Sequence, residues 1–236
     1  MWSRVLIAAL TLSCVACASY RTPGGAVPLE VLNRTVAPGA EPPQPSSRFP
    51  ARMAVARVQA AHYQSLTAEG QGKGALTVLP AQELLGAPQL DQLARWPAVA
   101  AAFAIEAPML PEQPESIDDL RMAAAKGQAD MLLVYTVDTA FQLKGRRYAP
   151  LAKLPLGSTP DAQDHISSQA LAVFLDVRTG FVYGVVEATA QVTGLDQDWG
   201  KPERIDQKRL AAEQQAFGQL LTQAAQRWAE IVARHQ

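Results

Sequence analysis

Cysteine is nearly absent from this chain of 236 residues: its two thiols, at Cys14 and Cys17, both lie near the N-terminus. From residue 18 onward the sequence therefore offers no partner for a disulfide and no thiolate for a metal site. An excess of charge is missing too, since 21 lysines and arginines are balanced by 22 aspartates and glutamates. This balance predicts neither a nucleic-acid-binding surface nor a surface for anionic lipids.

The N-terminal residues carry the clearest signal in the sequence. Arg4 precedes an almost wholly apolar run over 5–16, and Cys17 follows that run directly. About a dozen apolar residues are too few to span a bilayer and are typical of a secretory signal peptide. The ending Val15-Ala16-Cys17 resembles a bacterial lipobox, in which the cysteine becomes the lipid-bearing first residue of the mature protein.

We therefore expect residues 1–16 to be removed as a signal peptide and Cys17 to carry acyl chains. Cys14 is the alternative attachment site, and ordinary cleavage that leaves a free thiol at Cys17 is a further alternative. Several acyl chains, at about 0.8 kcal/mol per buried methylene, anchor a protein firmly. In lipoproteins, an aspartate after the cysteine retains the protein at the inner membrane. Ala18 stands at that position, so we expect anchoring in the outer membrane, with the protein facing the periplasm.

Proline and glycine dominate the next segment, over 17–48. Such a composition does not readily form a packed core, because proline lacks a backbone donor and glycine loses much entropy on ordering. We expect this segment to be a partly extended tether between the lipid and a globular domain at 49–236. Docking of 27–32 on the domain as a partial strand or turn is left open.

The sequence after residue 48 predicts a single α/β domain with a mixed sheet packed by helices and a long C-terminal helix. A run over 131–137 is apolar on both faces, which is typical of a central strand covered on both sides. Gly180 is expected to supply a positive φ in the turn of a hairpin. Predicted strands cover 53–59, 74–80, 131–137, 169–177 and 181–192; predicted helices cover 88–96, 116–126 and 205–234; and 98–107 fits either. The helix from Ser116 is expected to end with Gly127 in a left-handed conformation.

Three pieces of this pattern resemble a known family when taken together. They are the helix-to-strand passage over 116–135, the hairpin over 174–180 and the terminal helix. The set is similar to lipoproteins built like the curli-secretion lipoprotein and the amino-terminal domain of TolB. More narrowly, it resembles the proteobacterial family called rhombotarget lipoprotein. The resemblance covers roughly 49–236 and implies a role in periplasmic assembly, scaffolding or export without catalysis.

Candidate chemical sites are few. His62, His165 and His235 do not lie at metal-ligand spacing from one another. Asp161 and Asp164 cluster with His165, which could bind a metal, but a solvated loop is the simpler interpretation. We expect no metal and no cofactor other than the covalent lipid.

Known catalytic and phosphate-binding motifs are also weakly represented. The chain has no Gly-x-Ser-x-Gly elbow of a serine hydrolase. The glycine-rich stretch 70–74 lacks the hydroxyl residue that follows lysine in a phosphate-binding loop, so it is interpreted as a turn. Asp118 and Asp119 stand at a helix start, where the dipole favours negative charge.

The segment 144–168 is the best candidate for an interaction site. It is long for a loop inside one domain, and such loops are functional or disordered. Arg146, Arg147 and Tyr148 combine the residue types favoured as anchors in protein interfaces. The hypothesis is that these three residues dock a protein partner.

These observations lead to a functional expectation. The chain is expected to be a membrane-anchored bacterial lipoprotein with a non-catalytic binding, scaffolding or assembly role in the envelope. Its partners would be the membrane, through its acyl chains, and an envelope or secretion protein. Self-association through a sheet edge is left open. A periplasmic hydrolase acting on envelope material is the alternative.

Overall fold

The computed structural model describes residues 19–32, 41–70, 74–80, 83–157, 159–195 and 199–236. The predicted signal peptide and both candidate lipid sites, Cys14 and Cys17, lie outside the described residues. Within the described part, no helix is long and apolar enough to cross a bilayer.

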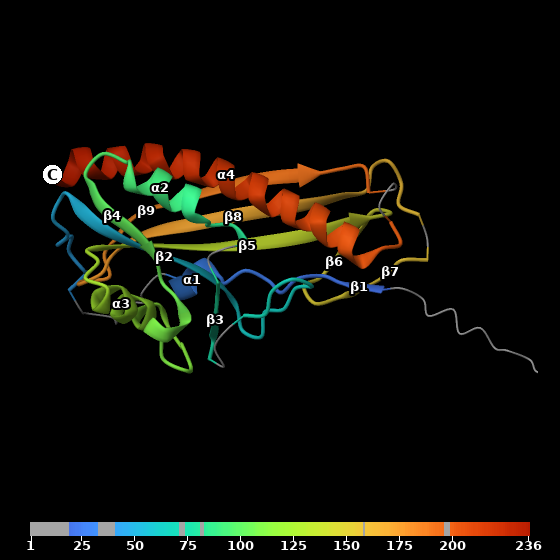
Figure 1. Ribbon diagram of the computed structural model, residues 1–236, viewed down its shortest axis with the longest axis horizontal. Coiled ribbons are helices and arrows are strands. Elements are labelled where there is room, and N and C mark those ends of the chain that lie inside the picture. Colours follow the sequence, from blue (N-terminus) through green and yellow to red (C-terminus); the bar gives the residue numbers. More distant parts are fainter. Residues whose placement is uncertain (1–18, 33–40, 71–73, 81–82, 158, 196–198) are drawn as a thin grey trace, which may run out of the picture.

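A mixed sheet of seven strands forms the body of the domain (Figure 1). Its strands are β2 (Ala51–Ala60), β3 (Leu76–Leu79), β4 (Val99–Ala104), β5 (Met131–Leu143), β6 (Arg146–Tyr148), β8 (His165–Asp176) and β9 (Val182–Val192). The main order is β3-β2-β5-β8-β9, with β4 also paired to β2 and β6 to β5. Pairing of β2 with β4 and with β5 is parallel, and the other pairings in this sheet are antiparallel. A separate two-stranded ladder joins β1 (Ser19–Arg21) to β7 (Lys153–Pro155).

Helices cover both faces of this sheet. They are α1 (Leu29–Leu32), α2 (Ala87–Ala94), α3 (Ile117–Lys126) and α4 (Pro202–His235), with a 3₁₀ turn at Ala107–Met109. Helices α2 and α4 lie on one face, and α1 and α3 lie on the other (Figure 1). At 1.5 Å per residue α4 is about 50 Å long, so it runs the length of the molecule. The predicted α/β class and the long C-terminal helix are therefore confirmed.

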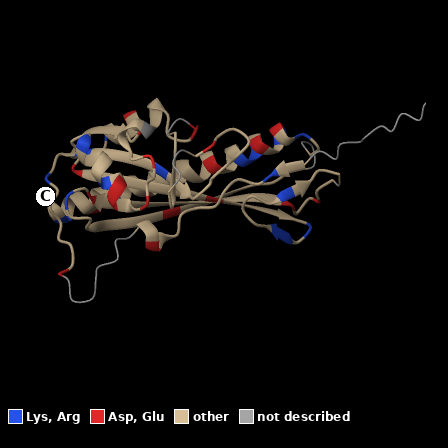
Figure 2. Ribbon diagram, turned by 90° about the horizontal axis from the view of Figure 1, so that it is seen from below, with Lys and Arg blue, Asp and Glu red and all other residues tan. Residues whose placement is uncertain are grey.

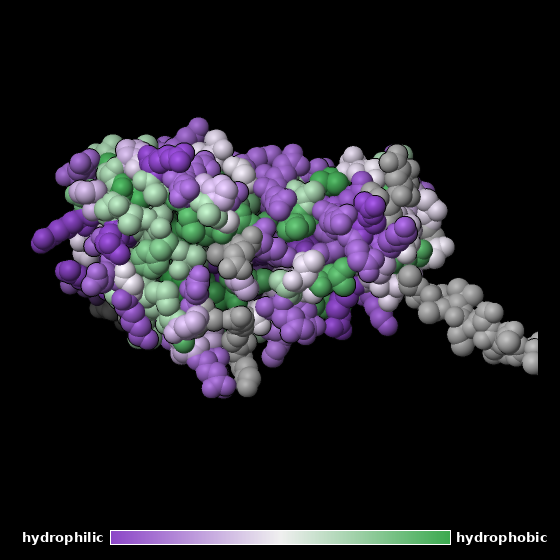
Figure 3. All heavy atoms as spheres, in the orientation of Figure 1, coloured by the Kyte–Doolittle hydropathy of each residue, from purple (hydrophilic) through white to green (hydrophobic). Residues whose placement is uncertain are grey.

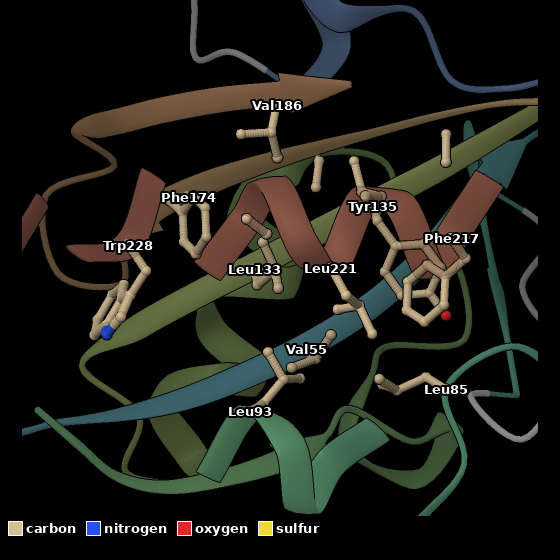
Figure 4. Packing of buried hydrophobic residues seen from close by; sticks show 14 of the residues in the cluster. Val55, Leu85, Leu93, Leu133, Tyr135, Phe174, Val186, Phe217, Leu221 and Trp228 are labelled. Carbon is tan, nitrogen blue, oxygen red and sulfur yellow. The ribbon is translucent and has the colours of Figure 1, made fainter. Parts of the chain in front are cut away.

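Alternation along the strands fills two cores, one on each face. Residues 133, 135 and 137 of β5 point to the α4 side, whereas 132 and 134 point to the α3 side. On the α4 side, Trp228 packs against Phe174 and its indole nitrogen donates to the carbonyl of Pro97 at 2.7 Å (Figure 4). A third apolar cluster lies beneath β1 and β7 and includes Tyr20, Phe141 and Ile205.

The ambiguous segment 98–107 contains strand β4. Its alanines favour a helix in isolation, but parallel pairing with Ala51–Val55 of β2 decides the conformation. Tertiary pairing overrides helix propensity here. The predicted strands and helices elsewhere in the domain are confirmed, with β5 extended to Leu143.

The predicted left-handed end of α3 is wrong by one residue. Gly127 has φ −78°, and Gln128 adopts the positive φ of 57°. Glycine at 127 has a different reason: a Cβ there would lie 2.6 Å from Cζ of Phe103. The residue is small because β4 and α3 approach closely, not because of its dihedral angles.

The hairpin between β8 and β9 turns as predicted, with Gly180 at φ 75°. We expect Gly180→Ala to lower the free energy of unfolding by about 1–2 kcal/mol, because a Cβ is strained in this region. It would also meet Nη1 of Arg121 at 3.1 Å. Gly157→Ala is the matched control: its Cβ meets nothing within 4 Å, so a change within about 0.5 kcal/mol is expected. Chemical denaturation of both variants measures the difference, and equal stabilities would contradict the strain argument.

The expectation of an extended tether over 17–48 is wrong for the described residues 19–32. Although the segment is rich in proline and glycine, its apolar residues Tyr20, Val27 and Leu32 are all buried. Docking, which the sequence left open, occurs well before residue 27, because β1 is already part of a ladder. The domain therefore includes segments that were assigned to the tether.

The prediction of one long loop over 144–168 is also wrong. Residues 146–148 form β6, residues 153–155 form β7, and β8 begins at His165. The insert is shorter and more ordered than expected because each of its halves finds a partner strand, β5 for β6 and β1 for β7.

Candidate functional site

The three hypothesised docking residues and the start of the described chain lie at one end of the molecule, here named the β1 end. It comprises β1, β6, β7, the turn that follows β7 and the start of α4, opposite the C-terminus (Figure 1). The described chain begins here, at Ser19. The β1 end therefore adjoins the segment that carries the predicted lipid site.

Strand β1 is fastened to the domain by its central residue. The Tyr20 hydroxyl donates to Oδ1 of Asp206 on α4 at 2.7 Å. Its ring, which is 1% exposed, packs 5.5 Å from that of Phe141. Burial and the neighbouring Asp206 raise the pKa of Tyr20, so it stays a neutral donor. The start of the described chain is thus held by the core and not by surface contacts.

The segment after β1 continues along the domain through backbone pairing. The Thr22 amide donates to the carbonyl of Ala152 at 2.9 Å, and the Ala60 amide donates to the carbonyl of Gly25 at 3.0 Å. Further on, the Val27 amide donates to Oγ1 of Thr136 at 3.0 Å. Hydrogen bonds therefore hold this segment at several successive points.

Asp206 belongs to a buried polar network between α4 and the sheet. The network joins two arginines to three carboxylates: Arg57, Glu83, Asp206, Arg209 and Glu213. Both arginine side chains are 0% exposed. Buried charges of this kind are tolerated only when they are paired, so the network fixes the position of α4 on the sheet.

Arg209 is the centre of this network. Its guanidinium binds Asp206 through two hydrogen bonds, Nε to Oδ1 at 3.0 Å and Nη2 to Oδ2 at 2.8 Å. Its Nη1 donates to Oε2 of Glu213 at 2.9 Å, and Nη2 also donates to Oγ1 of Thr67. Burial alone would lower the pKa of Arg209, but Glu213 and Asp206 outweigh burial and raise it. Arg209 is a fixed cation that several segments share.

Arg57 links the network to strands β2 and β5. It pairs with Glu83 at 2.8 Å and with Glu213 at 3.1 Å. Its Nε and the hydroxyls of Tyr63 and Tyr135 make no hydrogen bond within the described part. Burial raises the pKa of Tyr63 to about 12. Buried polar atoms of this kind are suited to ordered water.

Asp176 forms a second polar centre at the turn between β8 and β9. Its carboxylate, fully buried, accepts hydrogen bonds from backbone amides and hydroxyls. The donors are the amide and hydroxyl of Ser46, the amide and hydroxyl of Ser47, the amides of Arg178 and Thr179, and the hydroxyl of Tyr183. Burial would raise the pKa of Asp176, but these donors lower it to about 2. Asp176 thus holds Ser46 and Ser47, in the second half of the expected tether, on the β8–β9 hairpin.

The hypothesised docking residues lie together on β6. Arg146 and Arg147 are exposed, and Tyr148 is half-buried. The Arg146 guanidinium lies 5.5 Å from the centre of the Tyr148 ring, and Arg147 pairs with Asp138 at 3.1 Å. The structure brings these residues to the β1 end.

The other sequence candidates are placed apart or engaged in local structure. His62 follows β2, His165 starts β8 and His235 ends α4. Asp164 is buried and accepts the amides of Lys144 and Asp161 at 2.6 and 2.8 Å, next to a polar hollow that His165 also lines. Among the described residues, no group of three or more histidine, cysteine and acidic side chains could hold a metal ion.

Two motifs remain from the sequence: the carboxylates at a helix start and the glycine-rich stretch. Asp119 caps α3 by accepting the amides of Glu115 and Ser116, and Asp118 pairs with Arg121. Residues 71–73 of the glycine-rich stretch 70–74 lie outside the described residues.

Comparison with known proteins adds no relative: no family model, curated protein or solved structure matches this chain.

Proposed function

We propose that this protein is a lipoprotein anchored through Cys17 in the outer membrane, with a non-catalytic binding or scaffolding role in the cell envelope. The observation that carries the proposal is the lipobox-like ending Val15-Ala16-Cys17 after a short apolar run. Only Ala18 separates Cys17 from β1, and β1 is fastened to the core through Tyr20. A lipid at Cys17 would therefore hold the whole domain at the bilayer.

The use of buried ionisable groups supports a non-catalytic role. A general acid or base must be able to exchange a proton with its substrate. Asp206 and Glu213 are engaged with arginines, and Asp176 is surrounded by donors. These groups hold segments together, which suits a scaffold.

Lipid attachment is tested by mass spectrometry of the mature protein purified from membranes. We expect loss of 1–16, a lipid mass on Cys17 and retention of lipid in Cys14→Ala. Cys17→Ala should lose the lipid and leave the membrane fraction, because no acyl chain then opposes release. A lipid on Cys14, or an unlipidated wild-type protein free in the periplasm, would contradict the proposed anchor.

The binding role is tested by crosslinking in intact cells. A photoreactive residue at Met122, which is 55% exposed on α3, samples the end remote from the proposed anchor. We expect one dominant adduct of defined mass with an envelope protein. The matched control is a photoreactive residue at the buried Leu120, which should give none. Absence of any adduct from several exposed positions would argue against scaffolding and favour a search for enzymatic activity.

A further inference from the structure

We propose that the β1 end rests directly on the headgroups of anionic phospholipids. The inference depends on the proposed anchoring through Cys17, and it adds the orientation of the domain and the chemistry of its contact surface.

Chain length sets how far the domain can lie from the lipid. Ser19 is two residues after Cys17, and two fully extended residues span at most about 7 Å. The polar layer on each side of a bilayer is itself roughly 5–8 Å thick. The first residue of β1 therefore lies in this layer or at its edge. A domain on a thirty-residue tether would have had no such constraint.

The fixed position of β1 transfers this constraint to the whole domain. The hydroxyl of Tyr20 is hydrogen-bonded to Asp206 on α4, and the backbone of Arg21 pairs with that of Lys153 in the β1–β7 ladder. Detachment of β1 would turn it into a tether, but it would expose the buried Tyr20 and break the hydrogen bond from Tyr20 to Asp206. The β1 end is thus the part of the domain that must face the bilayer.

Exposed basic side chains outnumber exposed acidic side chains at this end. Figure 2 shows lysines and arginines on the strands at the end opposite the C-terminus, and hydrophilic residues are prominent there in Figure 3. Those exposed on β1, β6, β7 and the turn after β5 are Arg21, Lys144, Arg146, Arg147 and Lys153. The acidic residues near them are fewer and differ in their surroundings. Asp138 is paired with Arg147, and Asp164 is buried among amides. Asp161, Glu69 beside Arg21 and Glu203 at the start of α4 are exposed.

The overall composition does not reveal this clustering. The chain as a whole is balanced at a net charge of −1, which predicted no surface for anionic lipid. Folding nevertheless brings residue 21 of β1 next to residue 153 of β7, and both strands lie at the end that carries β6. A local surface potential depends on this placement and acts within about 8 Å at physiological salt. The proposed anchor brings the cluster within that range.

Anionic headgroups explain the basic residues better than a protein partner does. Each lysine or arginine near an anionic membrane surface strengthens its attraction roughly fivefold. A protein that docked on Arg146, Arg147 and Tyr148 would have to enter the space next to the bilayer. The same chemistry in a free phosphate group is distinguished by using intact vesicles.

The test uses the mature lipidated protein in vesicles of phosphatidylcholine, with or without phosphatidylglycerol. A single cysteine with an environment-sensitive label is placed at Gly157, where a side chain meets nothing within 4 Å. A second version has the label at Ala229, exposed near the opposite end. The protein without an introduced cysteine is treated with the same label as a control. It should take up none, because the thiol of Cys17 cannot react when it carries lipid. Quenching by neutral acrylamide reports how accessible each label is to water.

With phosphatidylglycerol, we expect the label at 157 to be shielded and the label at 229 to remain accessible. Changing Arg21, Arg146, Arg147 and Lys153 to glutamine should remove the shielding while the lipid mass on Cys17 remains. The matched control changes four exposed basic residues near the other end to glutamine: Arg48, Arg95, Lys126 and Arg234. It should leave the shielding intact.

Other outcomes overturn the inference. Headgroup contact is excluded if the labels at 157 and 229 are equally accessible. It is also excluded if the shielding at 157 is unchanged without phosphatidylglycerol or in the variant with four substitutions. Both results would hold even if Cys17 carries lipid. A label at 157 that is accessible on vesicles but shielded in intact cells would assign this end to a protein partner instead. Failure of the proposed anchor is recognised separately, by the absence of lipid on Cys17.

Discussion

Arg209→Met is expected to lower the free energy of unfolding by about 3–5 kcal/mol, which is the usual effect of removing one member of a buried charge network. The substitution keeps much of the side-chain volume but removes five donors. Asp206 and Glu213 would then remain buried with their main cation gone. Because domains of this size are stable by only about 5–15 kcal/mol, the variant should unfold at markedly lower denaturant concentration.

Arg204→Met is the matched control on the same helix. Arg204 lies in the first turn of α4 and is exposed, so its loss should change stability by no more than about 0.5 kcal/mol. Arg209→Lys should recover part of the loss, since lysine restores the charge but not the two-pronged contact with Asp206. Equal midpoints for Arg209→Met and Arg204→Met in urea unfolding would refute the structural role of the network.

The same network was not predicted from the sequence. Its α4 members, Asp206, Arg209 and Glu213, are spaced by three and four residues, and Phe217 continues this face. The apolar spacing over 205–234 predicts the helix, but it makes no prediction about the charged positions that extend its buried side. Charges of alternating sign on the continuation of an apolar stripe are the signal that could have revealed a buried network.

Local patterns predicted the central elements well because their cause is local. The apolar run of β5, the glycine turn after β8 and the spacing in α4 each report how one segment meets the core. The first described segment is different. Tyr20 is buried by Phe141 and Asp206, which lie more than a hundred residues away in the sequence. A composition rich in proline and glycine predicts little intrinsic structure but cannot exclude docking on a domain that has already folded.

Asp176→Asn is expected to lower the free energy of unfolding by about 2–3 kcal/mol at neutral pH, and this difference should nearly vanish at pH 2. The pKa of Asp176 is about 2 in the folded protein, and an unfolded aspartate has a pKa near 3.9. Its ionised form is thus favoured by folding, and the corresponding stability is present above about pH 4 and is lost as the pH falls to 2.

Comparing the variant with the wild type across this range isolates Asp176, because the other titrating groups are common to both proteins. Asparagine keeps one acceptor oxygen but points an amide at the donors of Ser46 and Ser47. The segment around Ser46 should therefore also become more open to proteolysis at neutral pH. Asp91→Asn, on the exposed side of α2, should be close to wild type at both pH values. The stability difference between Asp176→Asn and wild type could instead stay constant from pH 7 to pH 2. The contact of Asp176 with Ser46 and Ser47 would then depend on shape and not on the ionised carboxylate. In that case the second half of the expected tether would be held by packing at the hairpin, and acid would not release it.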